Sequence, residues 1–254
     1  MNTRKKVVVL FGESGAGKSS VINLIAGQNV ARTSSSPQRC TMRWEEYDIS
    51  FGGASYQVFD TIGLEDPQLG IKEYLECVES AYRLTKELDS RGGIDLLLFC
   101  IRAGRMPATL QSNYRLFHEF LCEKKVPIVL AITGLEREQR MEDWWEREYR
   151  AFKKYEIKGH ACITAADGLD GRHKVLYEES RVTIRRLVEQ FAADGQKQAW
   201  EGGDNLFVSL MRKLKQLLSG SSHLTRKELV PFLMKRCGMS KDTAKQLANM
   251  IKQD

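Results

Sequence analysis

The segment from Lys5 to Gly27 constrains the fold of this chain most strongly and reads KKVVVLFGESGAGKSSVINLIAG. It opens with a continuous apolar run, Val7–Phe11, and continues through a glycine-rich turn. Apolar residues at helical spacing follow between Val21 and Ile25. A short apolar run before such a turn indicates a buried strand, and the 3.6-residue spacing after it indicates a helix. The segment therefore predicts a strand, a tight loop and a helix in succession.

The loop of this segment fits the pattern GxxxxGK[ST] at every fixed position. Glycines allow backbone N–H groups to turn inward around a phosphate, and the start of the helix adds unpaired N–H groups. Lys18 can reach the outer phosphates of a nucleotide, and the Ser19 hydroxyl can bind Mg²⁺. The pattern predicts a phosphate site made by Gly12, Glu13, Ser14, Gly15, Ala16, Gly17, Lys18, Ser19 and Ser20.

The length and composition are ordinary for a globular protein of one domain with an appendage. The chain has 254 residues, of which 42% are hydrophobic and 28% charged. No apolar run approaches the roughly 20 residues that a membrane-spanning helix needs. The first six residues lead directly into the predicted strand, which leaves no room for a signal peptide. We therefore expect a cytoplasmic protein.

The cysteines and histidines are scattered along the chain. No CxxC pair occurs among the six cysteines, and the four histidines form no cluster in the sequence. Such spacing is typical of free thiols in a reducing compartment. The sequence therefore predicts neither a disulfide framework nor a metal site of cysteine and histidine. The cysteines are Cys40, Cys77, Cys100, Cys122, Cys162 and Cys237.

The positive charge of the chain is concentrated in its last part. The formal net charge is +6, and residues 195–254 hold 11 Lys/Arg against 5 Asp/Glu. Residues 1–194 hold 28 of each sign. A neutral main domain argues against a nucleic-acid partner and directs any electrostatic hypothesis to the tail.

Strand-like and helix-like segments alternate along the chain. Their alternation predicts an α/β fold with a mostly parallel sheet covered by helices on both faces. Ligands in such sheets bind at the carboxyl ends of the strands. Beyond the first helix, strands are expected at 44–51, 56–59, 94–101, 126–132 and 161–164, and helices at 66–90, 110–122, 141–155 and 174–191.

A second motif, Asp60-Thr-Ile-Gly63, ends the second of two strands that flank the turn Gly52-Gly53. An aspartate at the end of a buried strand can hold Mg²⁺, usually through a water molecule. The glycine can give its N–H to a γ-phosphate because no side chain crowds the backbone there. The alternative is a helix N-cap at Asp60.

These motifs together resemble the translation-factor-related P-loop GTPases, and most closely their septin-like branch. That branch includes the avirulence-induced and immunity-associated GTPases and the chloroplast import receptors. Uncharacterised fungal G-domain proteins of the same type are the most similar in overall sequence. The resemblance covers about residues 5–192. It implies a G domain at 1–194, followed by a basic helical extension at 195–254.

The resemblance implies roles for individual residues. Lys18 and Gly63 are expected at the γ-phosphate, together with a switch threonine that also binds Mg²⁺. Thr41 is the first candidate for that threonine and Thr33 its rival. Ser19, Thr41 and Asp60 would then form the Mg²⁺ site.

Residues Thr133, Gly134 and Glu136 stand where the family has the base-reading motif [NT]KxD. There the aspartate accepts two hydrogen bonds from guanine and the lysine stem covers the base. This chain has Glu136 for the aspartate and Gly134 for the lysine, so guanine selectivity is less secure than phosphate binding. Ala165, within Ile163–Ala166, resembles the fifth box, where a backbone N–H meets the guanine O6. An ordinary exit from the strand is the alternative.

The residue that orients water in many related enzymes is absent, because Leu64 follows Gly63. Replacements could come from Glu65, Asp66 or a switch-loop hydroxyl, or from an arginine of a partner subunit. Arg32 and Arg39 lie in a suitable loop, and solvated loop arginines are the alternative. An arginine finger contributes roughly 10³–10⁵ in rate, so its absence implies slow turnover of the monomer.

The basic tail carries amphipathic helical patterns. Leucines recur on one stripe of 206–218, and Thr225-Arg-Lys-Glu228 is a capping box before a second pattern. A helical extension that covers the core is one reading. A contact with a protein partner or a membrane surface is the other.

The sequence thus predicts a GTP-binding switch with slow Mg²⁺-dependent hydrolysis of GTP to GDP and phosphate. An ATP-preferring P-loop NTPase is the alternative if the altered base-reading motif no longer selects guanine. A nucleotide-dependent module that assembles as a homodimer across the nucleotide face is the other. No nucleic-acid partner is expected.

Overall fold

The computed structural model describes residues 4–32, 44–61, 81, 83–104, 110–122, 124–166 and 170–193, together with 230, 231, 234 and 245. A six-stranded sheet in the order β2-β3-β1-β4-β5-β6 forms its centre. Only β2 runs antiparallel to its neighbour β3, and the remaining pairs are parallel. The strands are β1 Lys6–Phe11, β2 Glu45–Phe51, β3 Ala54–Asp60, β4 Leu96–Arg102, β5 Ile128–Thr133 and β6 Gly159–Cys162.

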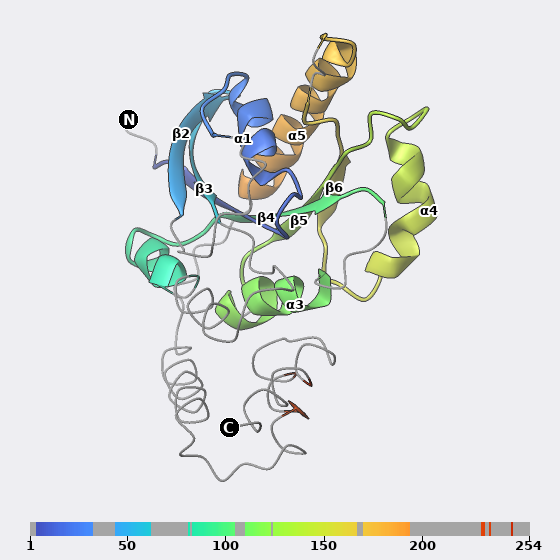
Figure 1. The fold of residues 1–254 in the computed structure, drawn as a ribbon. Coiled ribbons are helices and arrows are strands. Elements are labelled where there is room, and N and C mark those ends of the chain that lie inside the picture. The colour runs from blue at the N-terminus through green and yellow to red at the C-terminus, as the bar shows by residue number, and fades with distance from the viewer. Residues whose placement is uncertain are drawn as a thin grey trace, which may run out of the picture.

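Helices cover both faces of this sheet (Figure 1), as the alternating pattern predicts. Helices α1 and α5 pack on one face, whereas the helical residues 83–90, α3 with η1, and α4 pack on the other. The bounds are α1 Lys18–Ala26, α3 Leu110–Tyr114, the π-helix η1 Arg115–Leu121, α4 Glu142–Phe152 and α5 Lys174–Ala193.

The central strand β1 shows why its residues form a buried parallel strand. Its side chains alternate between the two cores, with Val7, Val9 and Phe11 on one side and Val8 and Leu10 on the other. All five are at most 3% exposed. A parallel strand buried on both faces requires a continuous apolar run, which the sequence supplies.

Several elements differ from their predicted bounds by a few residues, and two of these differences show how packing intervenes. The predicted helix 110–122 is α-helical only to Tyr114 and continues as a π-helix to Leu121. The last strand begins at Gly159 and ends at Cys162, so it lies earlier than the predicted 161–164. Gly159 pairs with Val129, and a Cβ there would lie 2.6 Å from the Phe191 ring. The close crossing of α5 over the start of β6 is a tertiary contact that local spacing does not report.

Part of the predicted extension lies against the main domain. Val230, Pro231, Met234 and Lys245 are helical. Val230 and Met234 are half-buried and pack against the core formed with 83–90, α3 and α4. Of the extension, the structure describes only these four residues.

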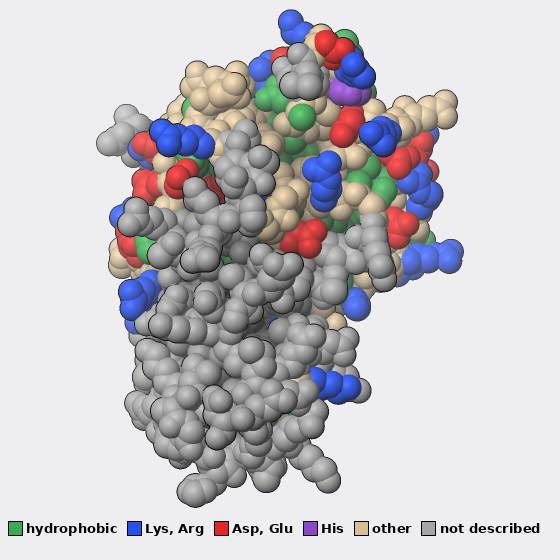
Figure 2. All heavy atoms as spheres, viewed as in Figure 1, with side chains coloured by type: hydrophobic (Ala, Val, Ile, Leu, Met, Phe, Trp, Pro, Cys, Tyr) green, Lys and Arg blue, Asp and Glu red, His purple; other side chains and the backbone are tan. Residues whose placement is uncertain are grey.

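Charged side chains of both signs are interspersed over the described part of the face in Figure 2. This agrees with the equal numbers of acidic and basic residues in 1–194. Among the described residues, no helix has both the length and the apolar character needed to cross a membrane.

Candidate functional site

The glycine-rich loop 12–17 connects the carboxyl end of β1 to the first turn of α1. Gly12, Gly15 and Gly17 have positive φ angles of 146°, 79° and 87°. A Cβ on Gly12 would lie 2.1 Å from the Cys100 backbone oxygen, so the loop lies directly against β4. The glycines therefore allow backbone conformations that can turn N–H groups around a phosphate.

Lys18 is the first residue of α1, and its side chain folds back over the loop. Its Nζ donates to the Gly12 oxygen at 3.1 Å and to the Glu13 oxygen at 3.0 Å. Burial lowers the pKa of Lys18, and the nearby Asp60 carboxylate opposes this effect. A buried ammonium that bonds to neutral acceptors gains strongly from an anion, because the anion replaces the hydration that burial removed.

Ser19 and Asp60 bring two hard oxygen ligands together beside the loop. The Ser19 Oγ donates to the Asp60 Oδ2 at 2.7 Å. Asp60 ends β3, whose neighbour is β1, so the sheet fixes the carboxylate next to the start of α1. Burial raises the pKa of Asp60, whereas the Ser19 hydrogen bond and the Lys18 charge lower it. Hydroxyl and carboxylate oxygens are the ligands that Mg²⁺ prefers, so this pair fits that ion.

Thr133 joins the predicted base-reading segment to the phosphate loop. Its Oγ1 donates to the Ala16 oxygen at 2.9 Å, and the residue is 3% exposed. A Cβ on Gly17 would lie 3.3 Å from the Thr133 side chain. Thr133 therefore ends β5 beside the phosphate loop, and within the described residues its side chain fixes the loop backbone.

Gly134 adopts a φ of +79°, a conformation that the usual lysine of the motif would adopt only with strain. A Cβ there would lie 3.4 Å from the Arg102 Cγ, so the Arg102 side chain flanks this position. Arg102 ends β4 and pairs with Thr133. Leu135 is buried and Glu136 is half-buried. Arg102 belongs to no motif in the sequence, because only the parallel register of β4 and β5 brings it here.

The segment after β6 is fixed by α5. The Thr164 backbone N–H donates to the Ser180 Oγ at 2.9 Å, and both residues are fully buried. The Thr164 Oγ1 contacts the Met141 Sδ at 3.5 Å. Ala165 packs against the core beside α1 and α5. Ser180 belongs to no motif in the sequence. Its place on the apolar stripe of α5, where a polar residue is unexpected, is a signal that the sequence does contain.

Replacing Ser180 by alanine should therefore destabilise the fold at this segment. The buried Thr164 N–H would lose its acceptor, which costs about 1–3 kcal/mol. Hydrogen exchange should show faster exchange of the Thr164 amide, and chemical denaturation should show the lower free energy of unfolding. Thr183→Ala is the matched control, because that exposed hydroxyl donates to the Glu179 oxygen of its own helix. Equal losses in both variants would contradict the prediction.

The segment after α1 is also fixed by a buried polar side chain. Asn23 bonds to the backbone of Val30 and Ala31 at 2.7–2.9 Å. From α5, Arg185 donates to the Ile25 and Ala26 oxygens and so caps α1. These contacts hold the start of the segment that leads to Thr33 and Thr41, the candidate switch threonines.

Several predicted site residues lie outside the described residues. Arg32 is described and is exposed. The undescribed residues are Thr33, Arg39, Thr41, Gly63, Leu64, Glu65 and Asp66.

A comparison with protein families identifies the main domain. Residues 7–134, just over half of the chain, match the family model described as 50S ribosome-binding GTPase. The chain belongs to this GTPase family. The matched segment contains the phosphate loop, Asp60, Thr133 and Gly134, and so includes most of the arrangement described above.

Curated proteins that this chain is similar to include GTPases named Era. The protein from Thermoanaerobacter sp. strain X514 is 29% identical over 177 residues, which cover 66% of this chain and 51% of the relative. The protein from Lactobacillus helveticus strain DPC 4571 is 30% identical over 131 residues, or 51% of this chain and 39% of the relative. The chain thus spans about half the length or less of these relatives.

Solved structures with the same fold include Toc33 from Arabidopsis thaliana. Its complex with GDP and Mg²⁺ has a TM-score of 0.54 at 21% identity, covering 78% of this chain and 87% of Toc33. A dimerization-deficient mutant of Toc33 has a TM-score of 0.55 at 22% identity, covering 78% of this chain and 86% of the mutant. At this identity the likeness shows the G-domain fold.

Proposed function

We propose that this family member binds GTP with Mg²⁺, hydrolyses it slowly to GDP and phosphate, and acts as a switch. The observation that carries the proposal is the placement of Lys18, Ser19 and Asp60 around one phosphate loop. A buried ammonium and two adjacent oxygen ligands suit the outer phosphates of a nucleotide and its metal ion. Membership of the septin-like branch is part of the same proposal.

Mg²⁺ would be held by Ser19 and Asp60, with Thr41 as the third ligand. When bound, the ion neutralises charge on the phosphate oxygens. Lys18 and the N–H groups of the loop would orient the γ-phosphate, and Gly63 would donate its N–H to it. Leu64 offers no group that orients water, which supports slow turnover by the monomer.

The guanine base would be read by Glu136 and covered by Arg102. Glu136 follows the buried Leu135 and makes no hydrogen bond or ion pair with another described residue, so its carboxylate can accept the two guanine N–H groups. Arg102 flanks Gly134, where the family has a lysine whose stem covers the base. A guanidinium stacks well on planar rings, so Arg102 can supply that cover from the neighbouring strand. Ala165 would give its N–H to the guanine O6.

Two alternatives remain testable. An ATP-preferring enzyme is favoured if the altered motif Thr133–Glu136 does not select guanine. A homodimerising module is the second, because for the chloroplast translocon components atToc33 and psToc159 dimerization is described as important for the GTPase activity. Arg32, which is exposed, would be one candidate to cross such an interface. Sedimentation with each nucleotide, and turnover at several protein concentrations, separate the module from a monomeric switch.

Equilibrium binding of fluorescent GTP with Mg²⁺, competed by unlabelled GTP and ATP, tests the main proposal. GTP should compete far better than ATP, and Glu136→Ala should lower this preference at least tenfold. Two hydrogen bonds to a charged group contribute about 1.5–3 kcal/mol each, and 1.4 kcal/mol is tenfold. Arg137→Ala, next in the chain and exposed, is the control. Equal competition by GTP and ATP in the unmodified protein would reclassify the chain as a general NTPase.

Arg102→Ala should weaken GTP and ATP binding alike, by about 2- to 30-fold. A guanidinium over an aromatic face contributes about 0.5–2 kcal/mol and does not distinguish the bases. The same competition assay measures the effect. An unchanged affinity for both nucleotides would show that Arg102 does not cover the base.

The division into a G domain at 1–194 and an extension at 195–254 is also a proposal. It is supported by the packing of Val230 and Met234 against the core of the main domain. We infer that the extension covers this face, while a protein or membrane contact through its basic residues is the alternative. A cytoplasmic location and the lack of a nucleic-acid partner stay predictions.

A further inference from the structure

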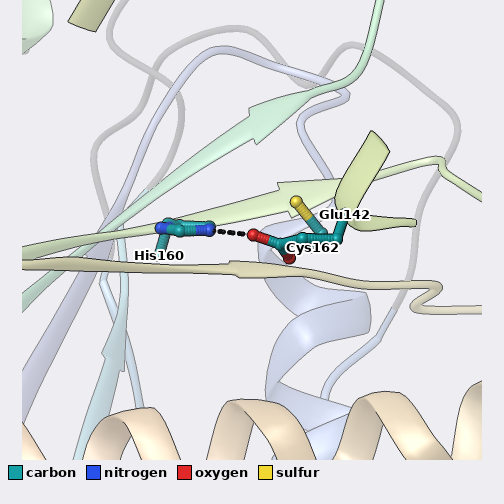
Figure 3. Close-up of side chains that lie close together, drawn as sticks. All are labelled: Glu142, His160 and Cys162. Atoms are coloured by element: carbon teal, nitrogen blue, oxygen red, sulfur yellow. Dashed lines mark hydrogen bonds and ion pairs between the residues drawn. The ribbon is translucent and has the colours of Figure 1, made fainter. Parts of the chain in front are cut away.

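Three side chains with metal-binding chemistry meet at the edge of the sheet next to α4 (Figure 3). His160 and Cys162 alternate along the edge strand β6, so both point to the same face of the sheet. Glu142 is the first residue of α4, which packs on that face. The sequence spacing predicts no metal site from cysteine and histidine, and only the crossing of α4 over β6 assembles this group.

The ligand atoms of the three residues are close enough to share one ion. They all lie within 4.8 Å of one another, and the Glu142 Oε1 lies 2.5 Å from the His160 Nε2. The Trp145 ring stacks on the His160 ring, with centroids 4.0 Å apart and an interplanar angle of 18°. This stacking fixes the imidazole, so one of the ligands is already oriented.

The donor set is a nitrogen, a sulfur and a carboxylate oxygen. Zn²⁺ binds such mixed sets in tetrahedral geometry, with metal–ligand distances of about 2.0–2.3 Å. Two ligand atoms of one such ion are therefore less than 4.8 Å apart, as the ligand atoms of these three residues are. Mg²⁺ and Ca²⁺ prefer oxygen ligands, so the cysteine excludes them as the preferred ion. Three protein ligands leave a fourth position for water.

The charge of Glu142 acts on the Cys162 thiol. Burial raises the pKa of Cys162 to about 12, and the negative charge of Glu142 contributes to the rise. A cation reverses both effects, because it neutralises the carboxylate and stabilises the thiolate. Zn²⁺ binding would therefore release the thiol proton.

We propose that Glu142, His160 and Cys162 form a Zn²⁺ site that ties α4 to β6. Each of the two elements adjoins one of the segments that are expected to contact the base. Helix α4 comes after Thr133–Glu136, and β6 leads into Ile163–Ala166. The site is separate from the Ser19 and Asp60 pair and does not depend on the proposed nucleotide.

The test titrates Zn²⁺ into the full chain, purified with a chelator and kept reduced, in competition with a chromophoric zinc chelator. One equivalent should bind, and the melting temperature should rise. Glu142→Gln, which alters an exposed side chain, and His160→Ala should each lower the affinity at least about tenfold. Co²⁺ should give a sulfur-to-cobalt charge-transfer band that Cys162→Ser removes.

Control variants separate this site from adventitious binding by other thiols and imidazoles. His173→Ala and Cys122→Ser should leave the affinity and the cobalt band unchanged, because both lie outside the group. The proposal is overturned if Glu142→Gln and His160→Ala bind Zn²⁺ as tightly as these controls. It is also overturned if the cobalt band persists in Cys162→Ser. Neither result bears on GTP binding, which is measured separately.

Discussion

Replacing Lys18 by alanine is expected to lower the affinity for GTP and Mg²⁺ by about 10²–10³-fold, with little effect on the fold. Within the described residues, the buried ammonium of Lys18 bonds to two carbonyl oxygens of its own loop. Each hydrogen bond to a charged phosphate contributes about 1.5–3 kcal/mol, and 1.4 kcal/mol corresponds to tenfold. Because the lysine is also a preorganised donor for the developing charge, hydrolysis of bound GTP should fall by about 10²–10³-fold as well.

Fluorescent GTP binding and single-turnover hydrolysis measure the two effects of Lys18→Ala. The melting temperature should not fall much, since burial lowers the pKa of Lys18 and its charge is therefore an unfavourable element of the fold. Lys5→Ala is the matched control, because Lys5 precedes the amino end of β1 and pairs with the exposed Asp48. Similar GTP affinities for the two variants would show that Lys18 does not contact phosphate.

Replacing Gly12 by alanine should destabilise the main domain by about 3 kcal/mol or more. The new Cβ would lie 2.1 Å from the Cys100 oxygen and 3.1 Å from its carbonyl carbon, and both belong to the backbone of β4. Backbone in a central strand cannot move aside as a flexible side chain can. The overlap costs about 1–3 kcal/mol and the positive φ at this position about 1–3 kcal/mol more. If β4 shifts instead, the loop moves and GTP binding should be lost.

Chemical denaturation of Gly12→Ala tests the expected loss, and Gly53→Ala is its control. Gly53 also has a positive φ, of 75°, but nothing lies within 4 Å of its Cβ position. Gly53→Ala should therefore lower the free energy of unfolding only by the cost of the left-handed conformation, about 1–2 kcal/mol. A Gly12→Ala variant as stable as Gly53→Ala, with normal GTP binding, would contradict the contact with β4.

The α/β fold and the mostly parallel sheet could be predicted from the sequence, because both follow from local patterns. Continuous apolar runs such as Val7–Phe11 gave buried strands, and the spacing of apolar residues gave the helices on both faces. The ends of elements were less predictable. The π-helical continuation Arg115–Leu121 and the early start of β6 depend on packing against other elements, which local spacing does not contain.

Some residues of the candidate site could likewise be predicted from the sequence, and others could not. The phosphate loop, Ser19 and Asp60 were predictable, because backbone geometry around a phosphate demands glycines, a lysine and a hydroxyl at fixed spacing. Thr133 was predicted as a base-reading residue, but its hydrogen bond to the Ala16 oxygen became visible only in the fold. Asn23, Ser180 and Arg102 were not identified, since each acts on a segment that is distant or unpatterned in the sequence.

The sequence by itself determined the elements of this protein and the identity of its phosphate loop, because each depends on residues that are neighbours in the chain. The tertiary structure alone decided which side chains from different elements meet. Arg102 reaches Gly134 through the pairing of β4 with β5. Glu142 reaches His160 and Cys162 because α4 crosses the edge strand. Such contacts arise from burying apolar surface on both sides of one sheet, a long-range effect that leaves no fixed spacing in the sequence.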